Sequence, residues 1–185
     1  MPDHHRDHPF PHSWGVLIPT RAESLPRHDR PDEIREWLAS AHYDPMTPGR
    51  EWAEDLGVAM LPLGPVMCAV RIPARMVHAV AGTDEAETVA DCLTQALRGP
   101  VIYDPLTARQ GYPYYALVPY RFLAEPFPAG TMYLGKGVWL GVPDLTRTGP
   151  RGVHWAVLPR FRNDLCSLDL VHGFILHAAA KAGDQ

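Results

Sequence analysis

The sequence predicts an α+β domain in which helices pack against a mixed or antiparallel sheet. Apolar residues recur with helical spacing in the first half, and short β-branched or aromatic runs, separated by Gly or Pro, fill the second half. The 185 residues, 46% of them hydrophobic, suffice for one domain with a substantial core. We expect a flexible His- and Pro-rich N-terminal segment over 1–30 and a single domain over 31–181.

Helices are expected where apolar residues recur every three to four positions and a capping residue precedes them. Thr47 can cap the second helix, with Pro48 in its first turn, and Thr83 can cap the fourth. The expected helices are 32–41, 47–55, 74–81, one from Thr83 to Leu97, and 165–181.

Strands are expected in the short apolar runs bounded by turn residues. Gly64-Pro65 marks a turn between the first two strands, and Gly135-Lys136-Gly137 is a tight hairpin signal between two later ones. The expected strands are 57–63, 66–72, Val101–Tyr103, Tyr112–Val118, Thr131–Leu134, Val138–Val142 and Val153–Leu158.

Charge and cysteine content limit the classes of protein to consider. The net charge of −4 gives no overall attraction to nucleic acid, although residues 98–163 hold eight basic and three acidic groups that could line one face. Cys68, Cys92 and Cys166 are far apart in apolar surroundings, which indicates reduced, buried thiols. Without an apolar signal core or a long apolar stretch, we expect a cytoplasmic protein that does not interact with membranes.

Several segments share their order and spacing with one known family. Two Trp-containing helical segments precede the strands at 57–63 and 66–72, a Gly-rich turn enters a strand that ends in Val-Pro over 108–119, and another strand ends at Pro over 134–143. A final strand begins at 152–155. Together these segments, over 32–160, resemble the bifunctional DNA primase/polymerase (Prim-Pol) family, especially its small single-domain bacterial relatives. The resemblance implies a two-layer domain related to the RNA-recognition-motif fold.

The positions of that family's catalytic acids hold other residues in this chain. The resemblance implies that acids of the first and third motifs hold two metal ions for nucleotidyl transfer. Here Cys68 and Val70 stand at the first motif, Met132 and Tyr133 at the third, and no Asp or Glu occurs within 56–83. A thiol, an alkyl chain and a thioether cannot assemble a magnesium site. We therefore expect a pseudoenzyme that holds no metal and no cofactor.

The β-rich half is where we expect a ligand. Arg109, Tyr114, Lys136 and Arg151 are the candidate contacts, because cations interleaved with aromatic residues can pair with phosphates and stack on bases. On this interpretation the chain is a regulatory protein that binds DNA, another nucleic acid or a nucleotide. Alternatively the aromatic residues pack the sheet and the cations are solvated. The chain is then a protein–protein interaction module, a homodimer or a partner-binding protein, that keeps only the fold.

Two other chemistries have less support in the sequence. Cys68 could be a nucleophile, but a small residue packed on a central strand is the interpretation that its apolar surroundings favour. The N-terminal histidines could bind zinc or nickel, but a solvated tail gains little preorganisation for a metal. These histidines are His4, His5, His8 and His12.

Overall fold

The computed structural model describes residues 28–121, 127–128 and 130–183. Helices and strands occur in blocks along this part of the chain, as the α+β prediction requires. The expected N-terminal segment, with His4, His5, His8 and His12, lies outside the described residues up to residue 27. The elements in chain order are α1 (Pro31–Ala39), α2 (Met46–Trp52), β1 (Val58–Pro62), β2 (Cys68–Ile72), α3 (Ala74–Ala81), α4 (Ala86–Leu97), β3 (Val101–Tyr103), the 3-10 helix η1 (Ala108–Gln110), β4 (Tyr114–Val118), β5 (Met132–Leu134), β6 (Trp139–Pro143), β7 (His154–Val157) and α5 (Leu168–Gly183).

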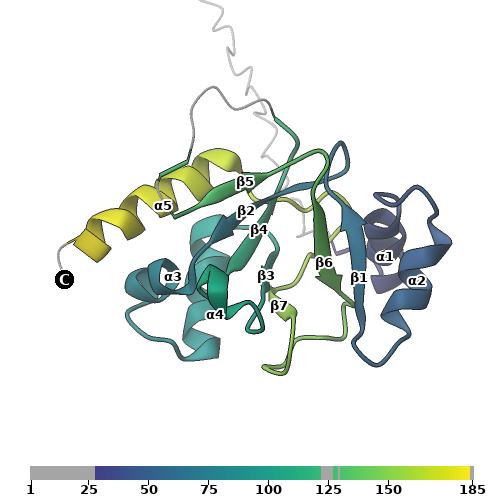
Figure 1. Cartoon of the computed structure of the whole chain (residues 1–185), viewed down its shortest axis with the longest axis horizontal. Helices are drawn as coiled ribbons and strands as arrows, with labels where there is room; N and C mark the ends of the chain where they lie inside the picture. The colour runs from purple at the N-terminus through teal and green to yellow at the C-terminus, as the bar shows by residue number, and fades with distance from the viewer. Residues whose placement is uncertain (1–27, 122–126, 129, 184–185) are drawn as a thin grey trace, which may run out of the picture.

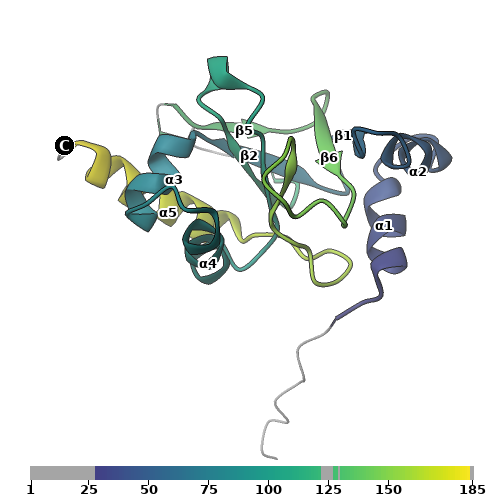
Figure 2. The same ribbon diagram turned by 90° about the horizontal axis from the view of Figure 1, so that it is seen from below.

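The strands form two antiparallel groups. Five strands make the central sheet in the order β5-β2-β4-β3-β7, while β1 and β6 pair with each other. Helices α3, α4 and α5 lie on one side of the central sheet, and the β1–β6 pair with α1 and α2 lies on the other (Figures 1 and 2). The sheet is therefore covered on both faces, which adds a third layer to the two that were expected.

The prediction of two hairpins is wrong, because the strands that flank each turn do not pair with each other. The turns at Gly64-Pro65 and Gly135-Lys136-Gly137 do form, since the amide of Gly64 donates to the carbonyl of Met67 and that of Val138 to Gly135. However, β1 pairs with β6 instead of β2, and β5 pairs with β2 instead of β6. Each turn thus carries the chain from one sheet to the other, because packing between distant segments decides strand partners.

Segments 58–72 and 132–143 run side by side as one bent ribbon. Its first half is the β1–β6 pair, and its second half is the β2–β5 pair at the edge of the central sheet. At the bend, the amide of Leu63 donates to the carbonyl of Val138 at 2.8 Å. The ribbon folds back over the sheet and encloses a second hydrophobic core.

Strand β4 shows why the sheet has two cores. Its five residues are all buried, although successive side chains point to opposite faces. Tyr114, Ala116 and Val118 belong to the core under the helices, and Tyr115 and Leu117 belong to the core under the ribbon.

Two helix caps differ from the expectation. Helix α4 is capped by Glu85, whose carboxylate accepts hydrogen bonds from the backbone amides of Glu87 and Thr88. Thr83 instead accepts a hydrogen bond from the Glu85 amide. Helix α2 begins one residue early, so Thr47 lies in its first turn. A carboxylate suits a helix N-terminus at least as well as a hydroxyl, which explains the first difference.

Helix α5 begins at Leu168, three residues later than expected. The preceding stretch lies beside the end of β4, where the amide of Cys166 donates to the carbonyl of Leu117 at 2.7 Å. Gly99 makes this approach feasible, because a Cβ atom there would lie 2.5 Å from the Cys166 nitrogen. Within the described part of the chain, no helix combines the length and the apolar character needed to cross a bilayer.

Candidate functional site

The four expected ligand contacts do not form one cluster. Arg109 lies in η1, between β3 and β4, and Lys136 lies in the turn between β5 and β6. Arg151 follows β6, so β6 separates it from Lys136. Tyr114 is the first residue of β4, and it lines a cleft whose neighbouring hollow is lined by Arg151. The structure thus places Tyr114 and Arg151 in adjoining sites, and neither Arg109 nor Lys136 lines them.

This cleft, which we call the aromatic cleft, has a volume of about 490 Å³. Its floor comes from the strands β3, β4 and β7, and its walls come from α3, the N-terminal part of α4 and the loop between β6 and β7. The lining residues are His78, Asp84, Ala86, Glu87, Val89, Ala90, Tyr103, Tyr114, Thr148, Pro150, His154, Trp155 and Ala156.

Four rings form a continuous aromatic surface in the cleft. Tyr103 and Tyr114 stack with their ring centroids 4.4 Å apart and an interplanar angle of 24°. His154 meets Tyr103 edge-on at 5.5 Å, and His78 meets Tyr114 edge-on at 6.0 Å. The stack follows from strand pairing, because Tyr103 lies directly opposite Tyr114 in the β3–β4 ladder.

The ring of His154 is held in one orientation. Only 7% of the residue is exposed, and its Nδ1 lies 2.8 Å from the carbonyl oxygen of Gly152. Because a carbonyl only accepts, Nδ1 must carry a proton. The other ring nitrogen, Nε2, has no hydrogen-bond partner among the described residues. Nε2 is therefore the ring nitrogen that can interact with whatever enters the cleft, and in the neutral ring it is an acceptor.

The other rings are uncharged at neutral pH. Burial lowers the pKa of His78, and the negative charge of Asp84 offsets only part of this effect. Burial likewise raises the pKa of Tyr103 and of Tyr114 above that of a free phenol. The hydroxyl of Tyr114 lies 3.3 Å from Nε2 of His78, so these two groups satisfy each other.

Two carboxylates stand at the rim of the cleft. Asp84 directly precedes the capping residue of α4, and Glu87 lies in the first turn of that helix. Both residues are exposed. The rim therefore presents two carboxylates, and His78 does not offset them, because burial lowers its pKa.

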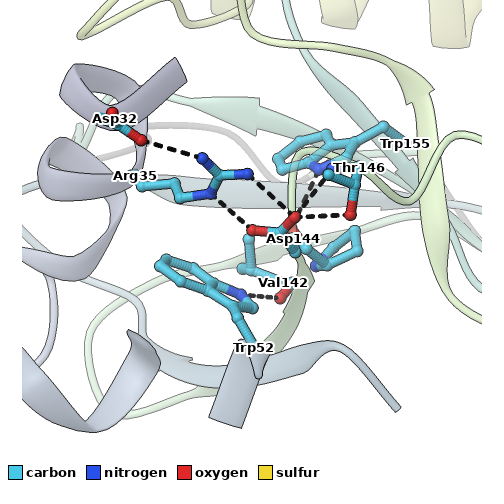
Figure 3. Close-up of polar contacts among 8 residues, drawn as sticks. Asp32, Arg35, Trp52, Val142, Asp144, Thr146 and Trp155 are labelled. Carbon is cyan, nitrogen blue, oxygen red and sulfur yellow. Dashed lines mark hydrogen bonds and ion pairs between the residues drawn. The ribbon is translucent and has the colours of Figure 1, made fainter. Parts of the chain in front are cut away.

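The loop between β6 and β7 forms one wall, and it is fixed at its start by Asp144. The guanidinium of Arg35 in α1 donates to both oxygens of this carboxylate, which also accepts hydrogen bonds from the amide and hydroxyl of Thr146 (Figure 3). Two indole nitrogens bind the last carbonyls of β6 nearby: Trp52 donates to Val142 at 2.9 Å, and Trp155 donates to Pro143 at 3.0 Å.

Arg147 stabilises the same loop from inside. Its guanidinium donates to the carbonyl of Arg151 at 3.1 Å and to that of Val153 at 3.4 Å. Its aliphatic part packs on Gly57, where a Cβ atom would lie 2.9 Å from Arg147 Cδ. In contrast, Arg151 is exposed and forms no ion pair with the described residues. Arg147 is thus structural, whereas Arg151 is available to a ligand.

The basic segment 98–163 supplies fewer available cations than its composition indicates. Arg160 pairs with Asp164 at 2.8 Å and also donates to the carbonyl of Arg98, and Arg162 pairs with Asp29 at 3.1 Å. With Arg147 bound to carbonyls, three of its eight basic side chains hold the fold together.

Two of the positions at which the resemblance expects acids, Cys68 and Val70, lie inside the protein, whereas Met132 is 51% exposed. Cys68 and Val70 are fully buried on the face of β2 that packs under the helices. Burial raises the pKa of the Cys68 thiol, and hydrogen bonds with Tyr133 and with the carbonyl of Gly64 offset only part of that. The thiol is therefore protonated at neutral pH, and a protonated thiol is a poor nucleophile and a poor metal ligand.

Sequence reasoning missed most of the cleft. His78, Asp84, Tyr103 and His154 come from four separate elements, so no spacing along the chain connects them. One signal was present, because His154 interrupts an apolar strand next to Trp155, and a polar residue there needs a buried partner. Comparison with family models, curated proteins and solved structures finds nothing that matches this chain.

Proposed function

We propose that this chain is a non-catalytic, primase/polymerase-like regulatory protein that binds a nucleotide in the aromatic cleft. The stacked pair of Tyr103 and Tyr114 is the observation that carries the proposal. Aromatic surfaces bind bases by stacking, and the cleft volume of about 490 Å³ falls within the range of small-molecule sites. The base would lie against the four rings.

Arg151 is the proposed phosphate contact. It lines the hollow next to the cleft, and the two hollows share Pro150. A nucleotide with its base on the rings can therefore extend its phosphate toward Arg151. The hollow has one other basic lining residue among the described residues, Arg147, whose guanidinium is already bound to backbone carbonyls. Lys136, at the other end of β6, has no part in this arrangement.

A mononucleotide fits these observations better than an extended strand does. Long single strands bind along grooves lined with cations that follow the phosphate backbone. Here Arg147, Arg160 and Arg162 are engaged in the fold, and carboxylates stand at the cleft rim. Nucleotidyl transfer has no place in the proposal, because Cys68 and Val70 offer no carboxylate to a magnesium ion.

Calorimetric titration of the purified protein with nucleoside monophosphates tests this proposal. We expect Tyr103→Phe, which keeps the stacking ring and loses only the hydroxyl, to bind within about three-fold of the wild type, and Tyr103→Leu to bind roughly ten-fold more weakly. Arg151→Ala should weaken binding, whereas Lys136→Ala, a matched loss of one exposed cation, should not. Absence of binding to all mononucleotides would refute the proposal. Anisotropy with labelled oligonucleotides at about 50 and 200 mM salt would show whether a strand binds instead.

An exposed patch favours a second function, the protein-interaction module. Tyr43 is 84% exposed and Trp139 is 46% exposed, and their rings meet edge-on with centroids 6.5 Å apart. Met60, 45% exposed, lies on the strand paired with that of Trp139. A second copy of this chain is the occupant we propose, because a symmetric dimer buries the same exposed apolar patch of both subunits in one contact. Light scattering should then give a dimer for the wild type and a monomer for Trp139→Ser.

A further inference from the structure

We infer that the aromatic cleft selects nucleotides whose base carries an exocyclic amino group, namely cytosine, adenine or guanine. This inference rests on the proposed nucleotide binding and adds the chemistry that would distinguish one base from another. It follows from the hydrogen-bonding groups that line the cleft and from their protonation states.

His154 is the central acceptor. The residue is buried to more than nine-tenths, its Nδ1 proton is committed to the carbonyl of Gly152, and its Nε2 has no partner among the described residues. This nitrogen is not sealed from solvent, so a ligand or a water molecule in the cleft can donate a hydrogen bond to its lone pair. An amino group or a ring N–H of a base can make that donation, so His154 favours a donor edge, and the choice of an amino group depends on the carboxylates at the rim.

The two rim carboxylates act in the same direction. Asp84 and Glu87 are acceptors when ionised, and an ionised carboxylate pairs with an amino group of a base by a charge-assisted hydrogen bond. If the base presents a carbonyl oxygen in place of the amino group, that oxygen faces a carboxylate oxygen. Both atoms are hydrogen-bond acceptors, so the contact is repulsive.

Donors are scarce among the lining residues. His78 is neutral because burial lowers its pKa, and the Tyr114 hydroxyl already lies within hydrogen-bond distance of it. The remaining donors are the hydroxyls of Tyr103 and Thr148, together with the one proton of the His78–Tyr114 pair that their mutual hydrogen bond does not use. The acceptor atoms, which are Nε2 of His154 and the four oxygens of the two rim carboxylates, outnumber these donors, so a donor-rich base edge is the complementary partner.

Two ligand pairs that differ in a single group test the inference. Cytidine monophosphate carries an amino group where uridine monophosphate carries a carbonyl group. Guanosine monophosphate carries a 2-amino group that inosine monophosphate lacks. Calorimetry should show the amino-bearing member of each pair binding roughly ten-fold more tightly, as expected for one hydrogen-bonded contact to a base edge. Asp84→Asn and Glu87→Gln should reduce this preference in at least one pair.

A control variant and the possible outcomes distinguish a failure of this inference from a failure of the proposed nucleotide binding. Glu54→Gln removes one exposed carboxylate beside α2, away from the cleft, and should leave the preference unchanged. Equal binding of all four nucleotides, or tighter binding of uridine and inosine monophosphates, would overturn the inference and leave nucleotide binding standing. If none of the four binds, the proposed function itself fails. Because Asp84 and Glu87 are exposed, their substitution is not expected to prevent folding.

Discussion

The guanidinium of Arg35 donates to both carboxylate oxygens of Asp144, with nitrogen–oxygen distances of 2.7 and 3.2 Å. The pair joins α1 to the first residue after β6, and only 13% of the Asp144 side chain is exposed. Bidentate pairs of this kind are stronger than single contacts at the surface. This pair therefore holds α1 against the end of the ribbon and fixes the loop that forms one wall of the cleft.

Asp144→Asn should lower the free energy of unfolding by about 2 kcal/mol, because it removes the less exposed of the two charged partners of the partly buried Arg35. Urea denaturation measures the change. Asp32→Asn is the matched control: Asp32 binds Arg35 at 3.2 Å, but its side chain is 84% exposed, so we expect a loss below about 0.5 kcal/mol. Equal losses in the two variants would show that burial does not strengthen the Arg35–Asp144 pair.

The contribution of Asp144 should depend on pH. Burial acts to raise the pKa of this carboxyl, but the hydrogen bonds from Arg35 and Thr146 outweigh it and hold the pKa well below the ordinary value. A carboxyl with a lower pKa in the folded chain stabilises that state above the unfolded pKa of about 4 and loses this contribution as the pH falls. The difference in urea midpoint between wild type and Asp144→Asn should thus have its full size near pH 7 and shrink progressively as the pH falls below about 4. A constant difference would contradict this assignment.

Gly99→Ala should destabilise the fold by about 3 kcal/mol, since the new Cβ would lie 2.5 Å from the backbone nitrogen of Cys166. No side-chain rotation relieves a clash with backbone, so the segment before α5 must move away from β4. Gly173→Ala makes the same chemical change inside α5, where no atom other than those of the neighbouring helix backbone lies within 4 Å of the added methyl group. It should stabilise by up to about 1 kcal/mol, because alanine favours a helix. Thermal unfolding of both variants checks the opposite signs.

Local sequence signals predicted most elements, but not how the strands pair. Helix 74–81 matches α3 to the residue, because Pro73 and Gly82 mark its two ends. The Gly64-Pro65 turn was also recognisable. However, the choice of β6 as the partner of β1 depends on burying Leu61 and Leu140 against the far face of the sheet. That is a contact between distant segments, which local propensity does not encode.

The candidate site was less predictable than the fold. Tyr114 was identified from its aromatic, β-rich surroundings, and Arg151 was identified from the loop that carries it. His78 and His154 carried no motif: His154 becomes a neighbour of Tyr103 when β3 pairs with β7, and His78 becomes a neighbour of Tyr114 when α3 packs on the sheet. Which cations are available also depended on the fold, because Arg147 and Arg151 differ only in their contacts.

The three thiols should react very unequally with an aromatic disulfide reagent. Cys68 and Cys166 are fully buried, and burial raises the pKa of Cys166 to about 12 and also raises that of Cys68. Cys92 is partly exposed on α4, although burial raises its pKa as well. The thiolate is the reactive form, so the native protein should release about one equivalent of chromophore, slowly and faster at higher pH.

Unfolding in urea should release the other two equivalents, and Cys92→Ala should react only after unfolding. Fast, stoichiometric modification of Cys68 in the native protein at neutral pH would instead indicate an ionised, accessible thiol on β2. Such a thiol would favour covalent chemistry at the position where the resemblance places an acid, and it would argue against a purely binding role.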